Sequence, residues 1–220
     1  MNSKRITIFA GHYGSGKTNI AVNYALHLRK NYDKVDIADL DIVNPYFRSK
    51  DSEKHLEERG IHLISSEYAN SNVDVPAMPA EAYAIIDDLS VRAVIDVGGD
   101  DRGALALGRY TPAIIEQNDY EMLFVFNMYR PLTPDAMSAF EVMKEIEAAG
   151  KIKFTAIVNN SNLGVLTTKE DVIASQESAN ELSRLSGLPI KMTTVSENLV
   201  NSFNGEIDNI FPLKLQKKIV

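Results

Sequence analysis

The octet Gly11-His12-Tyr13-Gly14-Ser15-Gly16-Lys17-Thr18 matches the pattern G-x-x-x-x-G-K-[ST]. It follows a short apolar run at residues 6–10 that is typical of a buried strand. After it, apolar residues recur at helical spacing over residues 17–31. A strand, a glycine-rich turn and a helix in this order aim backbone N–H groups and a helix N-terminus at one anion. The octet therefore predicts a phosphate-binding loop, and a glycine-rich turn without a ligand is the less favoured alternative.

Within the octet, two side chains have a chemistry that suits a nucleoside triphosphate. The glycines let the backbone bend around phosphate oxygens, Lys17 places a positive charge on the terminal phosphates, and the Thr18 hydroxyl can coordinate Mg²⁺. We expect Lys17 to act in catalysis as well as in binding. The residues expected to bind nucleotide are Gly11, His12, Tyr13, Gly14, Ser15, Gly16, Lys17 and Thr18.

Short runs rich in Val and Ile alternate with longer amphipathic stretches along the chain, as in β-α-β units around a parallel sheet. Several runs are apolar at nearly every position, which is typical of strands covered on both faces. The sequence predicts one α/β domain over residues 1–220, a three-layer P-loop fold with a mostly parallel central sheet and helices on both faces. Strands are expected at residues 5–10, 34–39, 61–65, 91–97, 121–127, 153–159 and 190–194.

Three helices have a clear apolar periodicity. They are expected at residues 17–31, at residues 134–149 with Gly150 as the C-cap, and at about residues 169–185 with Thr167 or Thr168 as the N-cap. The least regular stretch, residues 68–79, is expected to be a surface loop.

Composition excludes several classes of protein. Hydrophobic residues make up 45% of the chain and charged residues 24%, the balance of an ordinary globular protein. The absence of cysteine excludes disulfides, thiolate-held zinc, iron-sulfur clusters and cysteine nucleophiles, so any metal must be bound by oxygen. A net charge of -7 disfavours general nucleic-acid binding, which needs clustered Lys and Arg.

The sequence contains neither a signal peptide nor an apolar segment long enough to span a bilayer, so a cytoplasmic location is expected. The C-terminal stretch with Lys214, Lys217 and Lys218 could form a short membrane-seeking helix, but a helix of this length is marginal alone. A docked or loose terminus is favoured, and membrane binding is not expected.

Carboxylates stand where predicted strands end, as a phosphate site with Mg²⁺ requires. Asp39 and Asp41 close the second strand, and Asp96 lies in an apolar strand that runs into Gly98-Gly99. An aspartate in such a strand is costly unless a cation compensates its charge. We expect Thr18, Asp39 and Asp96 to bind the metal, whereas Asp100 and Asp101 are weaker candidates.

On these residues the chain resembles the CobQ/CobB/MinD/ParA group of P-loop ATPases, which includes dethiobiotin synthetase. The resemblance is based on the octet, on Ala38-Asp39-Leu40-Asp41 and on Ile95-Asp96-Val97-Gly98-Gly99. It implies ATP and Mg²⁺ as ligands, Asp41 beside the attacking water and Asp96 linked to Mg²⁺ through water. It also implies a homodimer. Because relatives usually carry lysine where this chain has His12, catalysis in trans is in doubt, and Arg48 or Arg102 could supply the missing cation.

The expected base is adenine. Guanine-specific proteins usually show [NT]-K-x-D, whereas this chain has Val158-Asn159-Asn160-Ser161-Asn162 after its sixth strand. An asparagine at this place touches adenine in the relatives, which suggests Asn159 and Asn160 as base contacts.

Three functions stay open. The leading hypothesis is a Mg²⁺-dependent ATPase switch, in which nucleotide state orders loops at residues 41–48 and 98–108 and an unidentified partner protein detects the change. The second is an ATP-dependent enzyme acting on a small molecule, with Arg102, Arg109 and Arg130 around an anionic substrate. The third is a nucleotide-bound scaffold with little or no hydrolysis.

Overall fold

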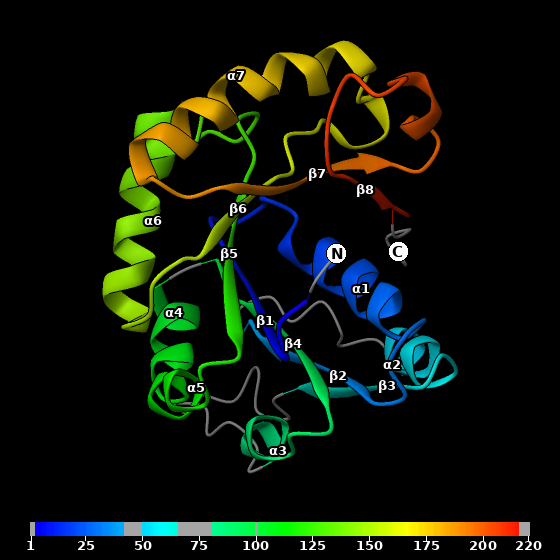
Figure 1. Cartoon of the computed structure of the whole chain (residues 1–220), viewed down its shortest axis with the longest axis vertical. Helices are drawn as coiled ribbons and strands as arrows, with labels where there is room; N and C mark the ends of the chain where they lie inside the picture. The colour runs from blue at the N-terminus through cyan, green and yellow to red at the C-terminus, as the bar shows by residue number, and fades with distance from the viewer. Residues whose placement is uncertain (1–2, 42–49, 66–80, 100, 216–220) are drawn as a thin grey trace.

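Eight parallel strands form one sheet in the order β3-β2-β4-β1-β5-β6-β7-β8 (Figure 1). The computed structural model describes residues 3–41, 50–65, 81–99 and 101–215. The strands are β1 (Ile6–Ala10), β2 (Val35–Leu40), β3 (Ile61–Ser65), β4 (Arg92–Val97), β5 (Tyr120–Phe126), β6 (Ala156–Asn159), β7 (Ile190–Ser196) and β8 (Ile210–Leu213). The expected parallel α/β architecture is confirmed.

Helices cover both faces of the sheet (Figure 1). The α-helices are α1 (Lys17–Leu28), α2 (Lys50–Glu57), α3 (Glu81–Asp87), α4 (Asp101–Gly108), α5 (Thr111–Gln117), α6 (Ala136–Gly150) and α7 (Lys169–Ser186). Among the described residues, the short 3₁₀ turns η2 (Gly164–Leu166) and η3 (Val200–Ser202) follow β6 and β7. Helices α1 and α2 pack on one face, while α3 to α7 pack on the other.

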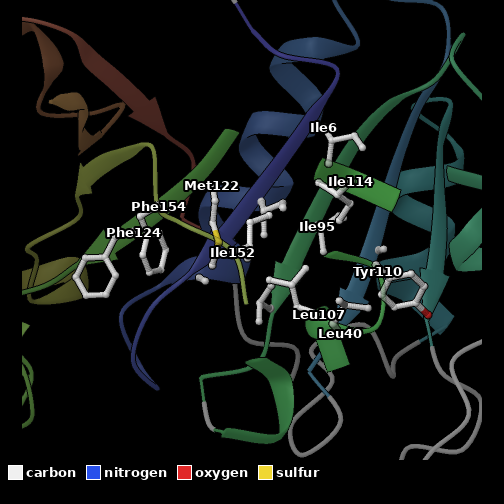
Figure 2. Packing of buried hydrophobic residues seen from close by; sticks show 14 of the residues in the cluster. Ile6, Leu40, Ile95, Leu107, Tyr110, Ile114, Met122, Phe124, Ile152 and Phe154 are labelled. Carbon is white, nitrogen blue, oxygen red and sulfur yellow. The ribbon is translucent and has the colours of Figure 1, made fainter. Parts of the chain in front are cut away.

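Each face has its own core, because alternate strand residues point to opposite sides of the sheet. On the α1 face, Phe9 stacks edge-on against Tyr24 with 5.4 Å between ring centroids. On the other face, the strand residues Ile95 and Phe124 belong to one cluster with Leu107 after β4 and Phe154 before β6 (Figure 2). Strands buried on both sides explain why the sequence shows continuous apolar runs instead of alternation.

The predicted strands are all present, but the chain adds an eighth. Residues 210–213, which the sequence did not predict as a strand, pair with β7, and Phe211 and Leu213 are buried against the α1 face. Lys214, at the start of the tail expected to be docked or loose, is docked on α1 through two hydrogen bonds with Asn23. The short β8 contains Pro212, which an edge strand tolerates because one side of it has no neighbour. Residues 216–220, including Lys217 and Lys218, lie outside the described residues. No helix in the described part of the chain is long and apolar enough to cross a membrane.

The three expected helices are confirmed, with differences at their ends. Helix α7 has Thr168 as its N-cap, and this residue forms a capping box with Asp171. Helix α6 includes Gly150 as its last residue, and Lys151 adopts the left-handed C-cap conformation, so Gly150 as the C-cap was wrong. The expected loop over residues 98–108 is mostly α4. The expected surface loop at residues 68–79 lies outside the described residues.

Candidate nucleotide-binding site

The octet, here called the P-loop, connects the central strand β1 to α1. Strand β1 has β4 on one side and β5 on the other, so the P-loop lies where the connections of the sheet diverge in opposite directions. Ligands of open parallel sheets bind at this place, outside the carboxyl ends of the strands. Gly16 precedes α1 with a φ of 93°, a conformation that glycine adopts without a Cβ penalty. The N-terminus of α1 therefore faces the space enclosed by the loop.

Lys17 is folded back over the P-loop. Its side chain is buried, and its Nζ donates a hydrogen bond to the His12 carbonyl oxygen at 3.1 Å. Ser15 is also buried, whereas Tyr13 exposes 62% of its surface. The His12 ring stays within the loop, with its Nδ1 3.0 Å from the Tyr13 carbonyl oxygen. The loop thus holds the Lys17 ammonium group at a fixed position.

Thr18 and Asp96 meet beside this lysine. The Thr18 hydroxyl donates to Asp96 Oδ2 at 2.6 Å, and the register of β2 and β4 places Asp39 directly opposite Asp96. Asp39 Oδ1 accepts a hydrogen bond from the Asp41 backbone N–H at 2.9 Å, which fixes the end of β2. The structure therefore brings together the P-loop and the three carboxylates that the sequence suggested.

The Asp96 carboxylate is in a costly environment. Burial raises its pKa to about 6, although Lys17 and the hydrogen bond from Thr18 act in the opposite direction. Its Oδ1 is buried without a hydrogen-bond partner among the described residues. A cation bound at this oxygen would remove the cost, because it would compensate the buried negative charge.

These donors fit Mg²⁺. A hydroxyl and carboxylate oxygens are the ligands that it prefers, and it usually takes only one or two carboxylates from the protein together with phosphate oxygens and water. Among the described residues, no group of three or more His, Cys, Asp or Glu side chains could hold a metal alone. Asp41, directly after β2, is half-buried.

Gly99 is a site residue that the sequence analysis did not single out by function. A methyl group added to Gly99 would come within 2.5 Å of the Tyr13 nitrogen and 2.9 Å of Lys17 Nζ. The end of β4 therefore lies directly against the P-loop, and only glycine allows this approach. The Gly98-Gly99 pair after Asp96 was the available signal, although a glycine pair alone does not say what it approaches.

Asn159 and Asn160, expected at the base, are both buried and bonded within the protein. Asn159 Nδ2 donates to Ser175 Oγ at 2.8 Å. Asn160 Nδ2 donates to the Ser15 carbonyl oxygen at 2.5 Å, and its Oδ1 accepts from the Thr194 hydroxyl. Asn160 thus stabilises the P-loop through its bond to Ser15, and nothing in the sequence indicated this contact.

Arg109 and Arg130, the two expected cations whose side chains the structure describes, do not lie together. Arg130, in the loop after β5, lies beside Gly14 of the P-loop. Arg109 is exposed and follows the end of α4. There Gly108 approaches Ala149 and Gly150 at the end of α6, on the side of the sheet away from the P-loop. Arg48 and the side chain of Arg102 lie outside the described residues, as do Asp100 and the Asp101 side chain.

A scan against protein-family models finds no match, and a search of curated proteins finds none either. Solved structures do match. Cell division protein FtsY from Thermotoga maritima is 22% identical with a TM-score of 0.57, over 87% of this chain and 62% of that one. The signal recognition particle receptor FtsY from Elizabethkingia anophelis is 18% identical with a TM-score of 0.55, over 91% and 62%. Signal recognition particle 54 kDa protein from Aeropyrum pernix K1, in complex with GDP, is 19% identical with a TM-score of 0.52, over 87% and 41%.

These matches show the fold, which is that of the P-loop nucleoside triphosphatases. The chain spans about three fifths of the length of the two FtsY structures and 41% of the 54 kDa protein. They also correct the resemblance to the MinD/ParA ATPases, because the matching structures are signal recognition particle proteins and their receptors. The motifs behind that resemblance are a phosphate loop and aspartates at strand ends. Such motifs recur among P-loop proteins and do not separate one branch from another.

Proposed function

We propose that this chain binds a purine nucleoside triphosphate with Mg²⁺ at the P-loop, hydrolyses it, and signals the nucleotide state to a partner. The observation that carries the proposal is the Thr18–Asp96 pair beside the buried Lys17. A hydroxyl, an unpaired carboxylate oxygen and a fixed ammonium group converge where backbone N–H groups and a helix N-terminus can bind an anion. The hydroxyl and the carboxylate oxygen can bind the metal ion, and the ammonium group can bind a phosphate of the triphosphate.

The residues of the site have different roles in hydrolysis. The P-loop amides bind the phosphates, Lys17 neutralises their charge, and Thr18 and Asp96 hold the cation with Asp39 nearby. Mg²⁺ held by these residues would supply positive charge to the phosphate oxygens. Asp41 orients a water molecule whose oxygen attacks the γ-phosphorus. The bond from that phosphorus to the β-γ bridging oxygen breaks, and the products are the diphosphate, inorganic phosphate and a proton.

The switch follows from the position of Gly99. This residue lies against Tyr13 and Lys17 and is separated by one residue from α4, which packs on α6. A γ-phosphate bound by Lys17 would occupy space next to Gly99, so its loss would alter the contact between the P-loop and Gly99, which leads into α4. Coupling of this kind changes a surface that a partner protein can detect.

The proposed base follows from the sequence after β6. The chain has Asn162 where guanine-specific proteins usually carry aspartate, and this favours adenine. However, Asn159 and Asn160 use their side chains internally, so they give no support for adenine. The Aeropyrum pernix neighbour was solved with GDP, which makes GTP the alternative substrate. We retain ATP as the proposed nucleotide and GTP as its direct competitor.

Calorimetry with ATP and GTP, each with Mg²⁺, tests the proposal. Lys17→Ala should weaken triphosphate binding by about tenfold or more, since it removes a charge-assisted contact to the terminal phosphates. Lys30→Ala, at an exposed position after α1, is the control and should bind as the wild type does. The proposal fails if wild-type protein binds neither nucleotide, or if Lys17→Ala binds as tightly as Lys30→Ala.

A further inference from the structure

The loop between β5 and α6 places one arginine at a fixed point beside the P-loop. Its backbone forms a tight turn, in which Arg130 N donates to the Asn127 carbonyl oxygen at 3.2 Å and Thr133 N donates to the Arg130 carbonyl oxygen at 3.1 Å. Asn127 is fully buried, and its Oδ1 accepts from Tyr129 N at 3.0 Å. The Thr133 hydroxyl also donates to the Asn127 carbonyl oxygen, at 2.9 Å. Four hydrogen bonds thus hold the Arg130 backbone in one position.

The Arg130 side chain lies against Gly14. Strands β1 and β5 are neighbours, so the loops that leave their carboxyl ends meet. Arg130 Cδ and Nε each lie 3.8 Å from the point that a Cβ on Gly14 would occupy, which is ordinary van der Waals contact. The guanidinium group is therefore carried alongside the middle of the P-loop.

In the described part of the chain this guanidinium has no acceptor. Arg130 Nε is buried and makes no hydrogen bond, and Arg130 takes part in none of the ion pairs there. A buried N–H without a partner is unfavourable, and arginine cannot escape the cost by losing its charge. Arg5 Nε is likewise buried without a partner, but its two Nη groups donate to the carbonyl oxygens of Ile85 and Ile86. The Nη groups of Arg130 make no such bond within the described residues. An anion is the acceptor that matches a guanidinium group, and the P-loop that Arg130 adjoins is the candidate anion site.

We infer that Arg130 is a phosphate-binding cation that contacts the phosphate chain of the nucleotide beside Lys17; this rests on the proposed function. The guanidinium presents several donors in a planar fork that matches phosphate oxygens. It supplies, from the same chain, a permanent positive charge that the His12 side chain does not.

Turnover and binding measurements on Arg130→Ala, Arg130→Lys and Arg109→Ala test this inference. Arg109→Ala is the matched control, because Arg109 is exposed and distant from the P-loop. Arg130→Ala should lower kcat by about a hundredfold, the usual effect of removing one donor to developing negative charge. Arg130→Lys should lie between Arg130→Ala and the wild type, and millimolar guanidinium ion should restore part of the Arg130→Ala activity. Inorganic tripolyphosphate, which has no base, should bind more weakly to Arg130→Ala than to Arg109→Ala.

The outcomes separate this inference from the proposed function. Wild-type turnover and tripolyphosphate affinity in Arg130→Ala would overturn the inference alone, provided that Lys17→Ala loses nucleotide binding. A loss of activity with a lowered Tm, and without rescue by guanidinium ion or by lysine, would show a structural role and also overturn it. If the wild type bound neither nucleotide nor tripolyphosphate, both proposals would fall together.

Discussion

Asn160 is the residue whose role changes most between sequence and structure, and a substitution can separate the two roles. Its amide supports Ser15 in the P-loop, so Asn160→Ala leaves the Ser15 carbonyl oxygen and the Thr194 hydroxyl without that partner. We expect ATP and GTP to bind about tenfold more weakly, each by a similar factor, because a loosened P-loop must be ordered again on binding. Calorimetry with both nucleotides measures the two ratios.

Asn159→Ala is the control for this prediction. It removes two hydrogen bonds, from Asn159 to Ser175 and from the Ser161 backbone N–H to Asn159, and neither of them touches the P-loop. It should lower stability without changing nucleotide affinity. If Asn160→Ala instead changed the ATP to GTP preference and left the P-loop affinity for tripolyphosphate intact, Asn160 would be a base contact after all.

Among the elements, the turn that joins α6 to β6 depends on one buried carboxylate. Glu147, in the last turn of α6, accepts from Lys153 Nζ at 2.6 Å and from the Phe154 backbone N–H at 3.1 Å. Burial acts to raise the pKa of Glu147, but these bonds outweigh it and the pKa is lowered. The carboxylate therefore stabilises the fold above its unfolded pKa, and this contribution is lost as pH falls through the lower folded value.

Glu147→Gln should thus destabilise the protein by about 1 kcal/mol at neutral pH, because most of the lost interactions are charge-assisted. The difference from the wild type should shrink once the pH falls well below 4.5, the ordinary pKa of this group. Urea denaturation at the two pH values measures both quantities. Glu145→Gln, on the exposed side of the same helix, should match the wild type throughout. A difference for Glu147→Gln that did not depend on pH would contradict this account.

How far an element could be predicted depended on its length and its local signals. Helix α7 has 18 residues and a capping box, so its period and start were both visible. Helices α2, α3, α4 and α5 have 7 or 8 residues, about two turns, which is too short for a periodic pattern to stand out. Strand β8 has only 4 residues, and one of them is a proline. The sequence does not show that this segment pairs with β7.

At the scale of the whole molecule, the sequence located the candidate site better than it explained its details. The P-loop and its carboxylates could be predicted because parallel strands end at a common edge and their order along the chain is visible. The Asn160–Ser15 bond and the position of Arg130 depend on which loops become neighbours, and the strand order decides that. Short motifs do not show to which branch of the P-loop proteins a chain is similar. They also do not show which nucleotide base it binds. Both the MinD/ParA resemblance and the Asn159–Asn160 contact with adenine were inferred from such motifs.

Burial of the Asp96 carboxylate should cost the protein stability, and a cation bound at this carboxylate should recover it. Saturating nucleotide and Mg²⁺, at about a hundred times Kd, should stabilise the chain by about 2.7 kcal/mol. For a chain of this size that corresponds to a rise in Tm of roughly 5–10 °C. EDTA should remove most of the rise, since a triphosphate without its cation would face the Asp96 carboxylate.

The variant Asp96→Asn should reverse this pattern. Its side-chain oxygen can still accept the Thr18 hydrogen bond, but the buried charge is gone, so the free variant should melt at a higher temperature than the wild type. Adding Mg²⁺ to its nucleotide complex should then produce little further change in Tm, because the cation has lost its carboxylate. Melting curves with nucleotide alone and with nucleotide plus Mg²⁺ measure both effects. An Asp96→Asn variant that gained as much from Mg²⁺ as the wild type does would show that the cation is held elsewhere.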